Sequence, residues 1–254
     1  MKKNGNNGIL NHNVKEKSEV MKLNILFEDE HILACVKPFG VPSQGDKSND
    51  EDMVTAVTNY LFDHSDSDEE PYVAIIHRLD RPVGGVLLFA KTPSMAAELS
   101  DMMQDGQIKK YYEAIVTGEL PDVDGTLTDY LVRNGKNNTT VVAKKGDKGA
   151  KKAVLDYEVI DVFETDQGVL SYILVELETG RHHQIRVQLA SRGCGIWGDT
   201  KYNPQFSKTK KRFTQIGLYS TRMEFTHPVT GEELVLKSLP YGEAFDVIEM
   251  DEFE

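Results

Sequence analysis

Short apolar segments, many of them with alternating apolar and polar residues, recur along most of the chain, a pattern typical of β-strands. The first two, 23–27 and 31–37, are separated by a short acidic turn. Later segments of the same kind predict further strands at 72–79, 85–91, 110–120, 153–163 and 169–179. We expect the last two to form a hairpin, because only a short polar, glycine-containing turn separates them.

Three segments have helical spacing instead. Apolar residues recur at helical intervals over 51–62, and 94–106 has the same pattern, with Ser94 as the expected N-cap and Gly106 as the stop. In 180–193 the pattern changes from a period of two to helical spacing. The elements follow too irregularly for repeated βαβ units. We therefore expect an α+β fold with a mixed, mostly antiparallel β-sheet and flanking helices.

The predicted domain covers 21–245. We expect 1–20 to be a disordered polar tail and 246–254 an acidic C-terminal tail. Two polar loops, 63–70 and 144–152, interrupt the domain. The first is acidic, and the second carries five lysines among nine residues, which suits either a solvated loop or contact with RNA.

The net charge of the whole chain restricts the possible functions less than its value suggests, because the charge is unevenly distributed. The 254 residues carry a formal net charge of −12, which argues against a simple nucleic-acid binder. However, 72–239 contains 22 Lys and Arg against 21 Asp and Glu, so the acidity is concentrated near the ends. No apolar run approaches the ~20 residues of a membrane helix. The two cysteines are too few for a disulfide scaffold and fit a reducing, cytoplasmic location.

One aspartate has an unusual setting. Asp80 lies between Arg78 and Arg81, just before an apolar, strand-like run. Neighbouring arginines stabilise an ionised carboxylate, which suits a nucleophile, a weak base or an electrostatic partner. A salt-bridged turn between two strands would produce the same local sequence.

A second polar segment, 179–186, follows the last predicted strand. Arg181 and Arg186 are expected near a helix N-terminus, which attracts anions. His182 and His183 are adjacent and would point about 100° apart on a helix, so they predict no shared metal site. The chain also lacks the glycine motifs of nucleotide-binding loops. We therefore expect neither a metal nor a cofactor.

Together and in this order, these segments resemble the RluA family of RNA pseudouridine synthases. The resemblance rests on "HRLDRPVGGVLLFAK", "KKYYEAIVTG", "ETGRHHQIRVQLA" and "GDTKY", and on the opening "ILFEDEHILACVKPFGVPSQ". It covers about 21–240 and implies a pseudouridine synthase fold. It also implies an enzyme, expected to be monomeric, that isomerises specific uridines in rRNA or tRNA to pseudouridine.

The resemblance implies roles for particular residues. Asp80 would be the nucleophile, at ribose C1′ or through another addition or elimination route, and Arg186 would pair with it. Tyr112 would stack on the target base and assist proton removal at C5, whereas Arg78 would displace the target nucleotide from its stack. Further candidates for substrate binding are Arg181, His183, Gln184, Ile185 and Ile196, the two isoleucines as apolar wall.

Two departures from the family pattern leave alternatives open. Val83, Gly84 and Gly85 stand where the family usually has Thr-Ser-Gly, and 193–196 lacks the usual G-H-P-I proline. A non-catalytic RNA-binding or RNA-chaperone protein on the same scaffold is the main alternative. A hydrolase that uses Asp80 with a second carboxylate is a weaker one.

About 20 residues precede the catalytic segment, too few for an N-terminal RNA-binding domain of the S4 type. We therefore expect loops of the catalytic domain, 133–152 and 205–212, to select the substrate.

Overall fold

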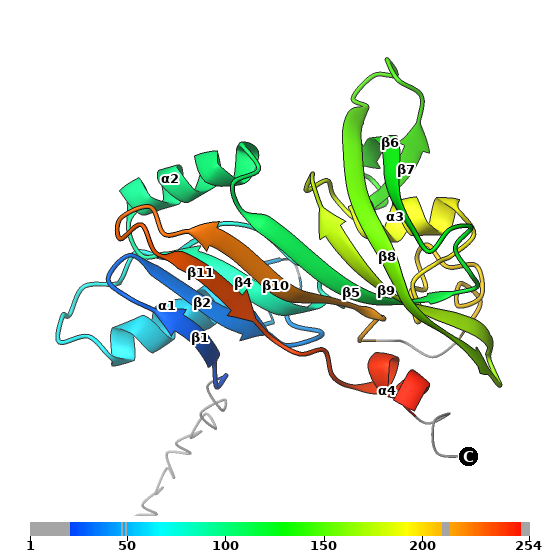
Figure 1. Cartoon of the computed structure of the whole chain (residues 1–254). Coiled ribbons are helices and arrows are strands. Elements are labelled where there is room, and N and C mark those ends of the chain that lie inside the picture. Colours follow the sequence, from blue (N-terminus) through cyan, green and yellow to red (C-terminus); the bar gives the residue numbers. More distant parts are fainter. Residues whose placement is uncertain (1–20, 47, 49, 210–213, 250–254) are drawn as a thin grey trace, which may run out of the picture.

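A computed structural model describes residues 21–46, 48, 50–209 and 214–249. The predicted tail 1–20, the last residues of the acidic tail and 210–213 of the predicted substrate loop lie outside this part of the chain. Within it, eleven strands form one sheet, in the order β1-β2-β4-β10-β5-β9-β8-β6-β7, with β3 on β4 and β11 on β10 (Figure 1).

The element bounds are as follows. The strands are β1 (Asn24–Glu28), β2 (Ile32–Lys37), β3 (Ala74–Ile75), β4 (Gly84–Ala90), β5 (Lys109–Thr117), β6 (Asp124–Asn134), β7 (Thr139–Ala143), β8 (Lys151–Thr165), β9 (Gly168–Leu177), β10 (Leu218–Thr226) and β11 (Glu233–Lys237). The helices are α1 (Met53–Asp63), α2 (Pro93–Gln104), α3 (Gln184–Ser191) and α4 (Glu243–Glu249). Among the strand pairs of the described residues only β4–β10 is parallel, so the predicted mixed, mostly antiparallel sheet is confirmed.

Strands β2 and β4 form the centre of one half of the sheet, and every residue in them is buried. Their side chains alternate between two hydrophobic clusters, as period-two geometry requires. Leu33, Cys35, Leu87 and Phe89 pack with α1, whereas Ile32, Ala34, Val86 and Leu88 pack with α2. The two helices therefore cover opposite faces of these strands (Figure 1).

Capping residues fix the starts of both helices. Asp52 accepts hydrogen bonds from the backbone N–H groups of Val54 and Thr55, which caps α1. The prediction of Ser94 as the N-cap of α2 was wrong. Thr92 is the N-cap, and its side chain accepts the backbone N–H of Met95. Pro93 then occupies the first turn, where its fixed φ and missing N–H cost nothing.

The largest error concerns the predicted strand 72–79. Only Ala74–Ile75 pairs with β4, and the chain then leaves the sheet. The backbone of Leu79 bonds to the Ser43 side chain, and Pro82 has no N–H to offer to a neighbouring strand. The apolar run is therefore followed by a loop rather than a continued strand, and this loop carries Asp80.

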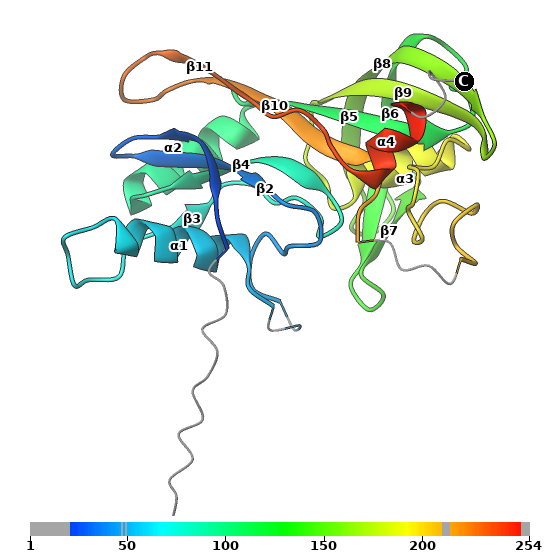
Figure 2. The ribbon, with the colours of Figure 1, turned by 90° about the horizontal axis from the view of Figure 1, so that it is seen from below.

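The other half of the sheet holds a long antiparallel ribbon. The predicted hairpin of β8 and β9 is confirmed, although β8 starts at Lys151, inside the expected lysine loop. The first part of the predicted substrate loop 133–152 belongs instead to a β6–β7 hairpin, which the apolar pattern did not predict. Figure 2 shows β7 standing out from the sheet beside α3.

The C-terminal segment is partly helical. Helix α4 covers 243–249, so the predicted acidic tail begins inside a helix. None of the described helices has the length and apolarity needed to cross a bilayer.

Candidate active site

A large open cavity lies where the loop after β3, strand β5, the start of α3 and the β6–β7 hairpin meet. Its volume is about 1190 Å³. Seven basic and three acidic side chains are among its lining residues: Arg78, Arg81, Lys110, Arg133, Arg181, Arg186 and Lys201 against Asp46, Asp80 and Glu178. The cavity is thus basic although the chain as a whole is acidic.

The loop that carries Asp80 is fixed from both sides of that residue. On one side, the Ser43 hydroxyl donates to the carbonyl oxygen of Leu79 at 2.7 Å and accepts its N–H at 3.1 Å. On the other, the N–H of Val83 donates to the Asp80 carbonyl oxygen at 2.9 Å and closes a turn. The backbone of Asp80 is therefore held in place independently of its side chain.

Arg81, which had no role in the sequence interpretation, anchors this loop. Its side chain points to the preceding loop, where it donates to the Gly40 carbonyl oxygen at 2.8 Å and pairs with Asp50. Its own carbonyl oxygen accepts from Gly40 N at 2.9 Å and from Lys37 Nζ at 3.1 Å. Lys37 is fully buried and also donates to two other backbone carbonyl groups.

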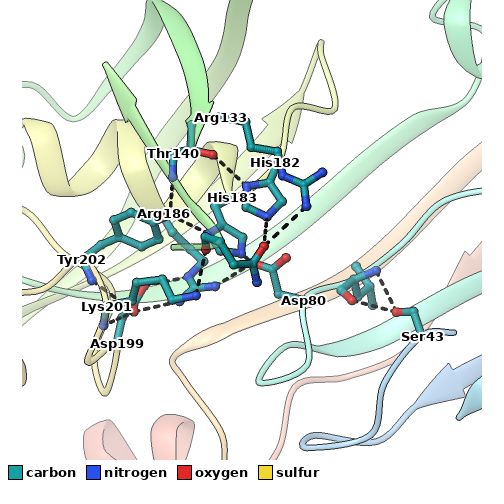
Figure 3. Close-up of polar contacts among 12 residues, drawn as sticks. Ser43, Asp80, Arg133, Thr140, His182, His183, Arg186, Asp199, Lys201 and Tyr202 are labelled. Carbon is teal, nitrogen blue, oxygen red and sulfur yellow. Dashed lines mark hydrogen bonds and ion pairs between the residues drawn. The ribbon is translucent and has the colours of Figure 1, made fainter. Parts of the chain in front are cut away.

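Arg186 connects Asp80 to a second carboxylate (Figure 3). Its Nη1 donates to Asp80 Oδ2 at 2.7 Å, while Nε and Nη2 donate to the two oxygens of Asp199 at 2.7 and 2.8 Å. Burial opposes a charge on Arg186, but the paired carboxylates outweigh it and raise the pKa of the guanidinium. Asp199 is 1% exposed, so Asp80 is the carboxylate that reaches the cavity.

The two adjacent histidines do not diverge as helical geometry predicted. Both precede α3, and their rings stack with centroids 3.7 Å apart. His183 Nε2 lies 3.5 Å from Asp80 Oδ2, and burial, followed by the charge of Arg186, lowers the pKa of His183 to about 2. No three His, Cys, Asp or Glu side chains of the described residues are grouped as metal ligands.

Of the two adjacent tyrosines on β5, only Tyr112 lines the cavity, because successive side chains of a strand point to opposite faces. Tyr111 lies on the other face, where the Arg222 guanidinium is 3.8 Å from its ring centroid. Burial, together with the charge of Asp80, raises the pKa of Tyr112. Tyr112 therefore presents a neutral phenol to the cavity.

Three further predicted site residues, Arg78, Arg181 and Ile185, line the cavity but differ in exposure and contacts. Arg78 is exposed at the cavity and makes no ion pair with any described residue. Arg181 also lines the cavity, although its Nε donates to the Lys152 carbonyl oxygen. Ile185 is buried and lines the cavity.

Two further predicted substrate-binding residues, Gln184 and Ile196, make structural contacts, and of the two Gln184 lines the cavity. Gln184 uses its amide to bond Thr179, the N–H of Arg181 and the carbonyl oxygen of Val154, which fixes the turn into α3. Ile196 is fully buried beside β5 and is not among the residues that line the cavity of the described structure.

Sequence reasoning missed Asp199, Tyr202 and Lys37. The first two lie in "GDTKY", which supported the resemblance without being given roles. Asp199 Oδ1 also accepts the N–H of Lys201, so a short aspartate-centred turn is the local signal. Nothing in the local pattern indicates that a lysine at the end of β2 would be buried.

Comparison with known proteins agrees with this site. The family model described as RNA pseudouridylate synthase matches residues 31–191. An uncharacterized RNA pseudouridine synthase of Bacillus subtilis is 30% identical over 224 residues, which are 88% of this chain and 70% of the relative. Ribosomal large subunit pseudouridine synthase D of Pseudomonas aeruginosa is 31% identical over 238 residues, 89% of this chain and 70% of the relative. The chain covers 63% of the protein of the same name from Nitrosomonas europaea.

Two solved human structures share the fold. RNA Pseudouridylate Synthase Domain Containing 4 superposes with a TM-score of 0.72 at 21% identity, over 89% of this chain and 92% of that one. Human RNA Pseudouridylate Synthase Domain Containing 1 superposes with a TM-score of 0.70 at 20% identity, over 89% of this chain and 86% of that one. The predicted fold and the predicted resemblance are confirmed: this chain belongs to the RNA pseudouridylate synthase family, and is an enzyme of the RluA type.

Proposed function

We propose that this enzyme converts a uridine of ribosomal or transfer RNA to pseudouridine, with Asp80 as the nucleophile. One observation carries the assignment. Asp80 is held on the wall of a basic cavity by Arg186, whose charge is in turn fixed by the buried Asp199. A carboxylate oriented in this way at the cavity wall is placed to form a bond with the nucleoside.

The isomerisation needs no added atom. The bond between N1 of uracil and C1′ breaks, the base turns, C5 bonds to C1′, and the proton of C5 is lost while N1 gains one. Asp80 acts as nucleophile in the first stage, whichever atom it adds to. Because Tyr112 is a neutral phenol, we propose that it supports the base by stacking, worth about 1–3 kcal/mol, rather than by acting as an ionised base.

The basic lining supports an RNA substrate. The target nucleotide must leave its stack, which costs a few kcal/mol, and phosphate contacts compensate part of this cost. Arg78 is exposed at the cavity without an ion-pair partner among the described residues, so its guanidinium is available to replace the lost stacking. Arg181 would bind a phosphate beside it.

The names of two relatives indicate the first RNA to examine. Both are called ribosomal large subunit pseudouridine synthase D, so large-subunit rRNA is the first candidate and tRNA the second. We propose that 133–152 selects the site, because Arg133 and Asn138 of this segment line the cavity. We propose that 205–212 also contributes. We also propose that the enzyme is a cytoplasmic monomer.

Pseudouridine mapping across all stable RNAs, in cells with and without the gene, tests the substrate assignment. We expect one or a few rRNA or tRNA positions to lose pseudouridine in the deletion strain and to regain it with the wild-type gene. An unchanged map in the deletion strain would contradict the proposal.

A further inference from the structure

We infer that Thr140, Tyr202 and His183 form a positioning relay, through which the β6–β7 hairpin fixes an imidazole N–H against the carboxylate of Asp80. This inference rests on the proposed function, since it assigns the relay to the proposed nucleophile. Thr140 contacts Tyr202, and Tyr202 contacts His183. The three residues come from three separate segments: β7, the turn after Asp199, and the residue before α3 (Figure 3).

The Tyr202 hydroxyl is the middle of the relay. Its oxygen accepts the backbone N–H of Thr140 at 2.8 Å and lies 2.6 Å from His183 Nδ1. A backbone N–H can only donate, so it directs the hydroxyl proton away from Thr140. His183 Nδ1 is the only other partner of this hydroxyl among the described residues, so the hydroxyl proton has an acceptor only if it is donated to Nδ1. The Tyr202 ring lies beside Arg186, whose Cζ is 5.1 Å from the ring centroid.

The acceptor role of Nδ1 fixes the tautomer of His183. A neutral imidazole carries one proton, and with Nδ1 accepting, that proton is on Nε2. Burial and the nearby Arg186 keep the ring neutral by lowering the pKa of His183 to about 2. The protonated Nε2 then lies 3.5 Å from Asp80 Oδ2. A different tautomer would place a lone pair against the carboxylate.

The backbone of His183 indicates that this orientation is imposed. Its φ of 54° lies in the left-handed region, which is uncommon for a residue other than glycine. His183 also occupies the N-cap position of α3 without making a side-chain cap bond, and it is 8% exposed. Strained backbones of this kind persist where the surrounding contacts require them.

The hairpin is anchored to the site by more than one contact. The Thr140 hydroxyl bonds His182 Nδ1 at 2.7 Å, and Asn138 Oδ1 is 3.1 Å from His182 Nε2. Lys201 Nζ donates to the Asn138 carbonyl oxygen at 3.0 Å. These contacts fix the position of the hairpin relative to the Tyr202 hydroxyl. Displacement of the hairpin would therefore break the hydrogen bond from the Thr140 N–H to Tyr202.

The relay has a consequence for the reacting oxygen. Arg186 and His183 both face Oδ2 of Asp80. In the described part of the chain no donor contacts Oδ1. The relay therefore holds one oxygen and leaves Oδ1 as the atom available to the nucleoside.

The first test is spectroscopic and needs no RNA. In the wild-type protein labelled with ¹⁵N-histidine, we expect His183 to show the Nε2–H tautomer, and Tyr202→Phe to convert it to a mixture. A wild-type His183 carrying its proton on Nδ1 would overturn the relay. Because substrate is absent, this result does not depend on whether the proposed function is correct.

The second test is kinetic. We expect Tyr202→Phe to lower kcat about tenfold, with KM and RNA affinity unchanged, because one neutral hydrogen bond of the relay is lost. Tyr172→Phe is the matched control: it removes a hydroxyl that bonds Glu113, away from the cavity, and kcat should not change. An unchanged kcat in Tyr202→Phe would overturn the relay, whereas a wild-type enzyme that forms no pseudouridine on any stable RNA would refute the proposed function.

Two further variants cover the case in which Tyr202→Phe folds poorly. His183→Gln keeps an N–H donor near the position of Nε2, and His183→Asn places its amide near Nδ1. We expect His183→Gln to have the higher kcat, by about tenfold. Asparagine tolerates left-handed backbone better, so a purely structural role predicts the opposite order and would overturn the relay.

Discussion

The role of Arg186 follows from its geometry rather than from its charge alone. Its planar guanidinium bonds two carboxylates at once, Asp80 at 2.7 Å and Asp199 at 2.7 and 2.8 Å. A lysine carries the same charge but cannot span both partners. The sequence predicted the contact between Arg186 and Asp80 through the family resemblance. Asp199 was missed because pairing across a fold leaves no periodic pattern in a sequence.

We predict that Arg186→Lys lowers kcat about 100-fold and the free energy of unfolding by about 3 kcal/mol, because it leaves buried Asp199 poorly paired. Turnover assays and urea unfolding measure the two effects. The matched change is Arg192→Lys, whose partner Asp129 lies 3.0 Å away and nearer the surface. It should stay within about 0.5 kcal/mol of wild type. Equal effects of the two substitutions would contradict this account of Arg186.

At the level of elements, the packing of β10 against β4 explains why glycines stand at 84 and 85, the first of which departs from the family pattern. A Cβ on Gly85, whose φ is 118°, would lie 2.2 Å from the Ser220 carbonyl oxygen, so only glycine fits. A Cβ on Gly84 would lie 2.8 Å from the Tyr219 ring. The space that a family-like side chain would need at this position is therefore filled by Tyr219, and the Asp80 loop is held by Ser43 and Lys37 instead.

Gly84→Ser, which brings in a hydroxyl residue like those usual in the family, should therefore destabilise this protein, by about 2 kcal/mol, because the Tyr219 ring must move. Urea unfolding measures the change. Gly135→Ser is the control, since no atom lies within 4 Å of its added Cβ and its φ is not positive. A Gly84→Ser protein as stable as wild type would show that the ring gives way without cost.

The elements themselves were predictable to different degrees. Strands β2 and β4 and helices α1 and α2 followed from apolar spacing, because each buries a regular face. The β6–β7 hairpin was missed because its strands are mostly exposed or half-buried, so they lack a clear apolar stripe. The loop after β3 was missed because its backbone bonds to side chains distant in sequence, such as Ser43.

At the level of the whole molecule, net charge and local charge differ in sign. The chain carries −12, but its cavity is lined by seven basic and three acidic side chains. Composition alone argued against a nucleic-acid binder, whereas the fold collects basic residues from loops, strands and a helix around one carboxylate. No sequence average could reveal this, because it depends on which segments meet.

Acid sensitivity should also be a property of the whole fold. Burial, followed by the charge of Lys110, lowers the pKa of His77 from 6.5 to about 3, and the pKa of His183 is lowered to about 2. The unfolded chain therefore binds more protons than the folded chain below pH 6.5. The stabilising contribution of these neutral rings is complete above pH 6.5 and is lost as the pH falls towards about 3.

Thermal unfolding between pH 7.5 and pH 4.5 should therefore show a falling Tm, and His77→Gln should reduce its slope, because one of these protonation differences is removed. His64→Gln, at an exposed histidine of the acidic loop, is the matched control and should leave the slope unchanged. A slope that His77→Gln does not alter would contradict the inferred neutral state of His77.

The most direct test of the central claim is tritium release from RNA labelled at C5 of uridine, with wild-type enzyme and Asp80→Asn. Asparagine keeps the size of the side chain but removes the charged nucleophile. We predict that release falls by at least about 1,000-fold while RNA affinity and Tm stay near wild type, and that Asp156→Asn, on the distant strand β8, changes nothing. Release by Asp80→Asn at the wild-type rate would contradict the assignment of Asp80 as the nucleophile.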